Sequence, residues 1–127
     1  MARVVWYAYA GLVWLFLAAL VLQIFYAGMG LFGSSHDMAP HVGLGWFLHL
    51  PLLLVLVAAL VARVGRPTIW WVLAMFLSGA IQPFLPGLRD DLPLVAALHP
   101  LNAVFLTLVT VKLAVDTLPR MRTAGEA

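Results

Sequence analysis

Two histidines and three amide side chains carry the clearest chemistry in this chain. His49 lies in the stretch Phe-Leu-His-Leu-Pro, and His99 lies in the stretch Ala-Leu-His-Pro-Leu-Asn. Both stretches belong to long apolar segments, where a polar side chain is costly and by default marks a functional site. Imidazole nitrogen is a ligand for haem iron, zinc and copper. Whether the two histidines meet depends on the elements that position them.

The composition is typical of an integral membrane protein. Of the 127 residues, 65% are hydrophobic and 9% are charged, whereas soluble domains are about half apolar and about a quarter charged. Apolar runs at about 4–32, 41–62, 68–85 and 94–118 each reach the roughly 20 residues that a transmembrane helix needs. We expect one membrane domain over residues 1–127, an all-α four-helix bundle with up-down-up-down topology, in contact with the lipid bilayer. The first run is too long for the apolar core of a signal peptide, so we expect it to be retained.

The basic residues predict the orientation of this bundle. Six of them fall on one side of the four-span topology: Arg3, Arg63, Arg66, Lys112, Arg120 and Arg122. Arg89 is the exception on the other side. Because cytoplasmic loops are rich in Lys and Arg, we expect both termini to be inside, in a bacterial cytoplasmic membrane, with loops 33–40 and 86–93 facing outward.

Several functions lack the residues that they require. The chain has no cysteine, which excludes disulfides, thiolate ligands, iron–sulfur clusters and covalently attached haem. A formal net charge of +2 is too small to suggest nucleic acid as a partner. No nucleophile–base pair or phosphate-binding loop supports a hydrolase or a transferase.

The polar residues of the four segments are predicted to lie in the outer half of the membrane. With a rise of about 1.5 Å per residue, they lie roughly 5–13 Å below the outer ends of their helices. They are Gln23, His49, Gln82, His99 and Asn102. Since polar side chains in lipid face the interior of the bundle, we expect one polar pocket near the outer face.

The leading hypothesis for this pocket is a b-type haem. His49 and His99 would be the axial ligands, because two imidazoles on different helices of a bundle can ligate one iron. Gln23, Gln82 and Asn102 would contact the haem propionates or support the ligands. The protein would then transfer electrons near the outer face, to or from a quinone or a larger membrane complex.

Other interpretations remain open. The polar groups could form hydrogen bonds that join helices, in an accessory or structural subunit of a larger complex, or a homo-oligomer could form a small-molecule or ion pathway. His99 could cap a helix that begins at Pro100. The outer-rim residues His36, Asp37 and His41 permit zinc or copper, although a solvated loop is favoured.

The order of these features resembles a group of small bacterial four-span membrane proteins of unknown function. The shared features are a glycine-rich end of the first helix, a histidine in the second, a glutamine late in the third and the stretch from Ala97 to Ala103. The arrangement is also similar, more distantly, to four-helix cytochromes of the b561 type. That resemblance implies histidine pairs for two haems at opposite sides of the membrane, but the inner half of this chain has no histidine and would hold one haem at most.

Overall fold

The computed structural model describes residues 2–125, with side chains described for residues 3–119. Within this range the chain forms helices joined by short turns. The elements are α1 (Ala2–Phe32), α2 (Ala39–Phe47), α3 (His49–Val61), α4 (Arg66–Ile81), the 3₁₀ helix η1 (Leu85–Leu88), α5 (Pro93–Ala96) and α6 (Leu98–Gly125). The side chains of Arg120 and Arg122, which contribute to the predicted orientation, lie outside the described ones.

Three stretches of helix are long and apolar enough to cross a membrane. They are Arg3–Phe32 with 30 residues, Ala39–Val61 with 23 and Pro93–Pro119 with 27. The fourth expected span, 68–85, is shorter in the structure, because α4 has 16 residues and ends at Ile81. Its rise of about 24 Å falls below the roughly 30 Å of a hydrocarbon core. Pro83 and Pro86 explain this early end, since neither can donate the backbone hydrogen bond that would continue the helix.

Prolines also divide two of the expected helices. Pro51 has no N–H for the carbonyl of Phe47, and α2 ends at Phe47. In the same way, Pro100 cannot bond to Ala96, and α5 ends at Ala96. In each case one residue separates the two helical pieces, because a proline removes the hydrogen bond to the fourth residue before it. His49 and His99 therefore each lie in the first turn of a new helix.

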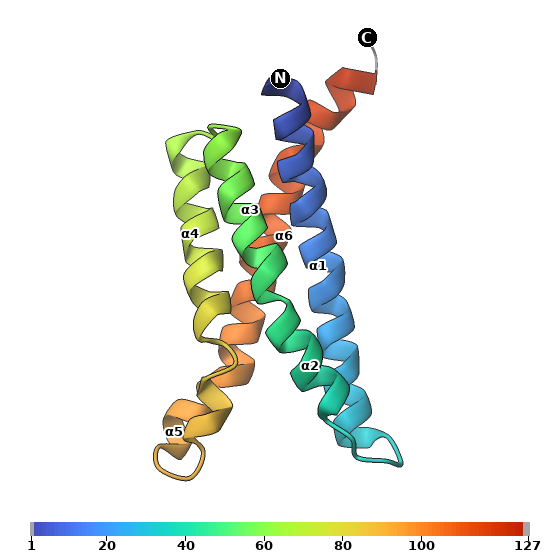
Figure 1. Cartoon of the computed structure of the whole chain (residues 1–127), viewed down its shortest axis with the longest axis vertical. Helices are drawn as coiled ribbons and strands as arrows, with labels where there is room; N and C mark the ends of the chain where they lie inside the picture. The colour runs from blue at the N-terminus through green and yellow to red at the C-terminus, as the bar shows by residue number, and fades with distance from the viewer. Residues whose placement is uncertain (1, 126–127) are drawn as a thin grey trace.

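The four long helical stretches pack as a bundle at the end that holds the start of α1, the α3–α4 turn and the last part of α6 (Figure 1). Each packs against two neighbours: α1 and α4 both contact α3 and α6. The core contains buried side chains from all four, among them Phe16, Val55, Met75 and Leu113. This half of the molecule is an ordinary apolar core.

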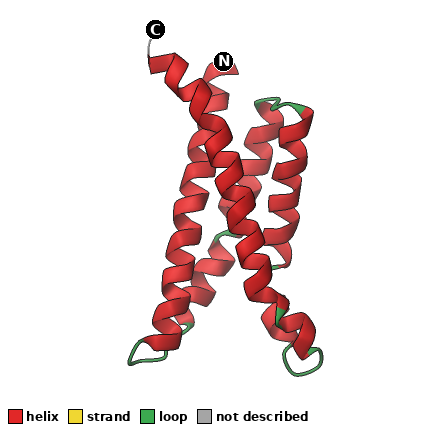
Figure 2. Ribbon diagram, turned by 180° about the vertical axis from the view of Figure 1, so that it is seen from behind, coloured by secondary structure: helices red, strands yellow, loops and turns green. Residues whose placement is uncertain are grey.

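The other half of the bundle is split into two arms. Figures 1 and 2 show α2 with the end of α1 diverging from the end of α4, α5 and the start of α6. We call residues 23–47 the first arm and residues 78–106 the second arm. All five polar residues singled out from the sequence lie in or directly beside these arms, at the open half of the molecule.

Candidate functional site

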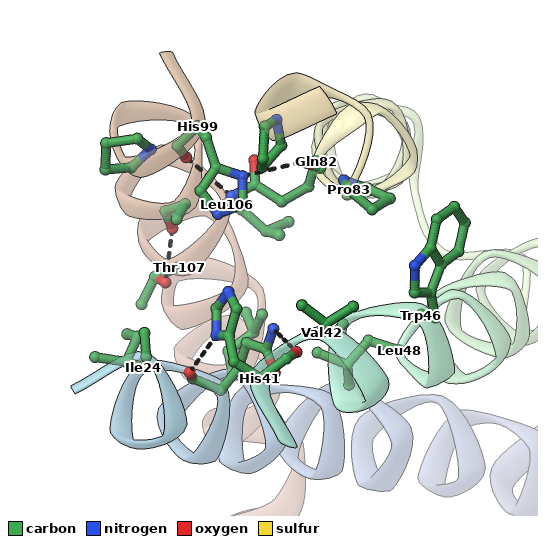
Figure 3. Close-up of a pocket in the computed structure, with 18 of the residues that line it drawn as sticks. Ile24, His41, Val42, Trp46, Leu48, Gln82, Pro83, His99, Leu106 and Thr107 are labelled. Carbon is green, nitrogen blue, oxygen red and sulfur yellow. Dashed lines mark hydrogen bonds between the residues drawn. The ribbon is translucent and has the colours of Figure 1, made fainter. Parts of the chain in front are cut away.

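A cavity of about 920 Å³ lies between the two arms. Figure 3 shows His41 and Val42 on one wall and Gln82, Pro83 and His99 on the other. Most of the remaining lining is apolar, and the core residues Phe16, Leu52 and Leu106 line its inner part. Pockets for small molecules and cofactors measure about 300–1,000 Å³, so this cavity is large enough for a ligand of that class.

The first arm is held together by a reciprocal pair of hydrogen bonds between α1 and α2. Gln23 Nε2 donates to the carbonyl oxygen of His41 at 2.7 Å, and His41 Nδ1 lies 3.0 Å from the carbonyl oxygen of Gln23. Since a carbonyl oxygen only accepts, His41 Nδ1 is the nitrogen that carries the proton. Gly45 makes room for this contact, because a Cβ there would lie 2.9 Å from Gln23 Nε2. We call this arrangement a glutamine–histidine bracket.

The second arm repeats the bracket between the end of α4 and the start of α6. Gln82 Nε2 donates to the carbonyl oxygen of His99 at 2.9 Å, and His99 Nδ1 lies 3.0 Å from the carbonyl oxygen of Gln82. The Gln82 carbonyl is free for the imidazole because Pro86, four residues later, has no N–H. The two brackets thus use the same backbone and side-chain atoms of Gln and His.

Two further residues fix the second bracket. Asn102 Nδ2 donates both to Gln82 Oε1 and to the carbonyl oxygen of Ser78, the latter at 2.9 Å. In return, Ser78 Oγ donates to Asn102 Oδ1 at 2.8 Å. Ser78 is buried, whereas Gln82 and Asn102 are half-buried. The network pairs their polar groups, which would be costly to leave unpaired away from water.

The two brackets present their histidines to each other. The imidazole rings of His41 and His99 have centroids 6.2 Å apart, and their planes are inclined by 79°. Because each Nδ1 donates to a carbonyl, each Nε2 keeps a lone pair. A backbone carbonyl bound to the second ring nitrogen is also the usual support of a metal-ligating histidine.

The spacing of these rings can be compared with that of axial haem ligands. With metal–nitrogen bonds of about 2 Å and a ring radius of about 1 Å on each side, two axial imidazoles have centroids roughly 6 Å apart. The separation of 6.2 Å between His41 and His99 fits this geometry. A flat, largely apolar group between the arms would also suit the mostly apolar walls of the cavity. The ring spacing and the apolar walls are thus compatible with a flat metal-containing group that the two histidines would hold.

His49 lines the same cavity but has a different environment. Its Nδ1 lies 3.0 Å from the carbonyl oxygen of Trp46, and its ring stacks on Trp46 with centroids 5.5 Å apart. Its Nε2 is buried, and among the described residues neither this atom nor Gln23 Oε1 has a hydrogen-bond partner.

The structure brings the residues singled out from the sequence to one site. Gln23, His49, Gln82 and His99 line the cavity, and Asn102 is bound to Gln82. His99 lies inside α6, which begins at Leu98, rather than before it. His41 is not among the residues that depth singles out, because the sequence favours a solvated loop there. Its separation from Gln23 by 18 residues is close to the 17 between Gln82 and His99, and this similarity could have indicated a second glutamine–histidine pair.

The outer loop gives no support to a zinc or copper site. His36 is exposed, and Asp37 Oδ1 accepts a hydrogen bond from the backbone N–H of Ala39 at 2.8 Å, at the start of α2. Among the described side chains, no group of three or more histidine and acidic residues is close enough to hold a metal ion. Asp37 therefore has a local structural role at the entry to α2.

Comparison with other proteins identifies a family but no activity. No curated protein and no solved structure matches this chain, so the distant similarity to b561-type cytochromes stays an expectation. One family model matches residues 23–87, a stretch that contains Gln23, His41, His49 and Gln82 but ends before His99. Because the match covers just over half of the 127 residues, the chain belongs to the family of unknown function DUF6220.

Proposed function

We propose that this protein binds one b-type haem between its two arms and transfers electrons. The observation that supports this function best is the pair of imidazoles from His41 and His99, with centroids 6.2 Å apart across a cavity of about 920 Å³. Both rings donate their Nδ1 proton to a carbonyl and keep Nε2 as the nitrogen for the iron.

His99 belongs to both candidate pairs of histidine ligands. The sequence pairs it with His49, whereas ring proximity favours His41. His49 stacks on Trp46 instead, one helical piece further into the bundle. We therefore propose that His41 and His99 would hold the iron, with His49 as the alternative partner of His99.

The other residues of the site would hold the ligands and exclude water. The brackets formed by Gln23 and Gln82 fix the tautomer and the orientation of His41 and His99. Apolar side chains such as Phe16, Leu20 and Leu106 keep the inner part of the cavity dry. Haem supplies one-electron exchange, and its potential depends on such surroundings. Arg89 also lines the cavity near the outer turn, but its side chain is largely exposed and lies 3.7 Å from Asp90.

The distribution of Lys and Arg supports an orientation of the bundle in the membrane. We propose that the arms lie at the outer side of a bacterial cytoplasmic membrane and that both termini are inside, as the Lys and Arg residues favour. Electrons would then pass near the outer face, with a membrane quinone or a larger complex as the partner. Three helical stretches long enough to span a membrane are consistent with this setting.

A visible absorption spectrum of the purified protein tests the proposal. Protein from haem-supplemented cells should show a Soret band that shifts on reduction with dithionite, together with α and β bands. The variants His41→Leu and His99→Leu should each lose the six-coordinate spectrum. The matched variant His49→Leu, in the same cavity, should keep it.

Other spectra would change the ligand assignment or overturn the proposal. A spectrum lost in His49→Leu but kept in His41→Leu would restore the ligand pair expected from the sequence. Colourless protein from haem-supplemented cells would overturn the haem proposal. Co-purification of that colourless protein with a stable set of partners would then favour an accessory subunit of a membrane complex.

A further inference from the structure

The turn between α3 and α4 carries two exposed cations at the packed end of the bundle. Arg63 lies in the turn and Arg66 is the first residue of α4, and both are exposed. Among the described side chains, the salt bridges involve Arg89 and Lys112 instead. Since three residues of chain span at most about 11 Å, the two arginines lie on one short segment of the surface. We call residues 62–67 the basic turn.

Arg63 occupies a backbone conformation that favours glycine, with a φ of 51°. At the end of α3 its N–H donates to the carbonyl of Leu60, and the N–H of Val64 donates to the carbonyl of Ala59, both at 3.1 Å. This pair of bonds is typical of helix ends at which glycine takes the left-handed position. A larger side chain there costs free energy, because its Cβ approaches a backbone oxygen. The chain thus has an exposed charge where the fold alone favours glycine.

An exposed tryptophan lies one helical turn beyond the second arginine. Trp70 follows Arg66 by four residues on α4, so the two side chains share a face of the helix. Trp70 lies about 6 Å further along the axis, and it is 64% exposed. Tryptophan is enriched at the level of lipid head groups, because its ring is apolar and its N–H is polar. This helix face therefore suits a lipid whose phosphate lies beside the arginine and whose apolar part lies beside the indole.

Two other charged side chains near the basic turn balance each other. Lys112 Nζ on α6 lies 5.4 Å from the ring centroid of Trp71, and it forms a salt bridge with Asp116. Asp116 lines a small cavity together with Gly65 of the basic turn, so a carboxylate lies near the arginines. Because Lys112 neutralises that carboxylate, the basic turn keeps a net positive charge.

We propose that the basic turn and Trp70 bind the head group of an anionic phospholipid. A guanidinium group matches a phosphate with two parallel N–H donors, and basic segments at the ends of membrane helices are attracted to the negative surface of the cytoplasmic leaflet. The orientation proposed above places the basic turn at that leaflet. The turn lies at the opposite end of the bundle from the two arms (Figure 1), so lipid binding requires no haem.

Native mass spectrometry of the full-length protein in a non-ionic detergent tests the proposal by titration with two lipids, dioleoylphosphatidylglycerol and dioleoylphosphatidylcholine. The acyl chains and the phosphate are the same, but the choline cation cancels the negative charge of the second lipid. We expect the wild-type protein to bind phosphatidylglycerol at least tenfold more tightly, because each arginine near an anionic head group contributes about a fivefold factor. Equal affinities for the two lipids would overturn the proposal.

Charge-removing variants and one matched control locate the site. Arg63→Gln and Arg66→Gln should each lower phosphatidylglycerol affinity about fivefold and leave phosphatidylcholine affinity unchanged. Arg89→Gln removes the same charge from an exposed turn at the other end of the bundle and should change neither affinity. An equal loss in all three variants would mean that net charge alone attracts the lipid, and the site at the basic turn would be wrong.

Arg63→Gly separates the charge of the basic turn from its shape. Glycine adopts the left-handed conformation without strain, so this variant should resist unfolding by SDS at least as well as the wild-type protein. It should still lose phosphatidylglycerol affinity about fivefold, whereas Arg63→Lys should keep most of it. Wild-type affinity in Arg63→Gly would contradict the proposal, because the charge at residue 63 would then have no part in binding.

Discussion

The two arms of this protein contain the same glutamine–histidine bracket, but more hydrogen bonds fix the bracket of the second arm than that of the first. In the second arm, Gln82 Oε1 accepts a hydrogen bond from Asn102, which is itself fixed by Ser78. In the first arm, no described residue forms a hydrogen bond with Gln23 Oε1. Each bracket orients one histidine, so His99 is held by a network and His41 by two hydrogen bonds alone.

This difference shows how a small bundle can combine a fixed and an adjustable side of one site. A fully paired buried network is rigid, because breaking any member leaves others unsatisfied. A bracket with a spare acceptor can exchange partners at lower cost. We therefore expect the second arm to define the position of a ligand and the first arm to adapt to it. Side-chain replacements in the two arms should therefore lower the free energy of unfolding by different amounts.

Removal of Asn102 should weaken the second arm most. Asn102→Leu deletes the hydrogen bonds to Gln82 Oε1 and the Ser78 carbonyl and leaves Ser78 Oγ without its acceptor. Side-chain hydrogen bonds between membrane helices contribute about 0.6 kcal/mol on average, and unpaired buried groups add to the loss. We expect the free energy of unfolding to fall by about 2–3 kcal/mol, measured by SDS titration in mixed micelles with circular dichroism.

A matched control for that variant lies on the same helix. Thr107 also lines the cavity, and its hydroxyl donates to the carbonyl of Ala103 within α6 at 2.8 Å. Thr107→Val keeps the shape of the side chain and breaks no contact between helices, so the free energy of unfolding should change by less than about 0.5 kcal/mol. A loss equal to that of Asn102→Leu would show that α6, rather than the network, is the sensitive element.

The two bracket glutamines should differ when they are replaced in the same way. Gln82→Leu removes the bond to the His99 carbonyl and one of the two acceptors of Asn102 Nδ2. Gln23→Leu removes only the side-chain bond to the His41 carbonyl. The expected losses in the free energy of unfolding are about 2 and about 1 kcal/mol, measured by the same titration. Equal losses would mean that the Asn102 network adds no stability and would contradict the proposed asymmetry.

Among the replacements that break a hydrogen bond between helices, the smallest loss in the free energy of unfolding should come from the packed half of the bundle. Trp14 Nε1 on α1 donates to Thr117 Oγ1 on α6 at 3.1 Å. Trp14→Phe removes this bond and keeps an aromatic ring, so the expected loss is about 0.6 kcal/mol. Haem content should stay at its wild-type value, since Trp14 does not line the cavity. A change in haem content would mean that the packed half controls the arms.

Much of the fold could be predicted from the apolar runs and the prolines. The four expected segments correspond to α1, to α2 with α3, to α4, and to α5 with α6. The effect of Pro51 on the Phe47 carbonyl was also predictable, because a proline acts on the fourth residue before it wherever it occurs in a helix. The short length of α4 was less accessible. Its end depends on how Pro83 and Pro86 together redirect the chain into a turn and a 3₁₀ helix.

Most residues of the candidate site could be predicted from the sequence, but the two histidines that lie ring to ring could not. Depth along each helix identified Gln23, His49, Gln82 and His99, which all line one cavity. Depth gave no reason to choose His41, because a histidine near the start of a helix is indistinguishable from a loop residue in one sequence. Its role depends on the close approach of α1 and α2 at Gly45, which allows the two backbone carbonyls to be bridged.

Hydrophobicity and proline positions are enough to predict an all-helical chain, stretches long enough to span a membrane and the places where those stretches are interrupted. These properties depend on neighbours within a few residues and on the missing N–H of proline. The division of the bundle into two arms, and the approach of His41 rather than His49 to the ring of His99, became visible in the folded chain. Such pairings depend on the direction in which each helix leaves the core, and that direction is set by packing between residues far apart in the chain.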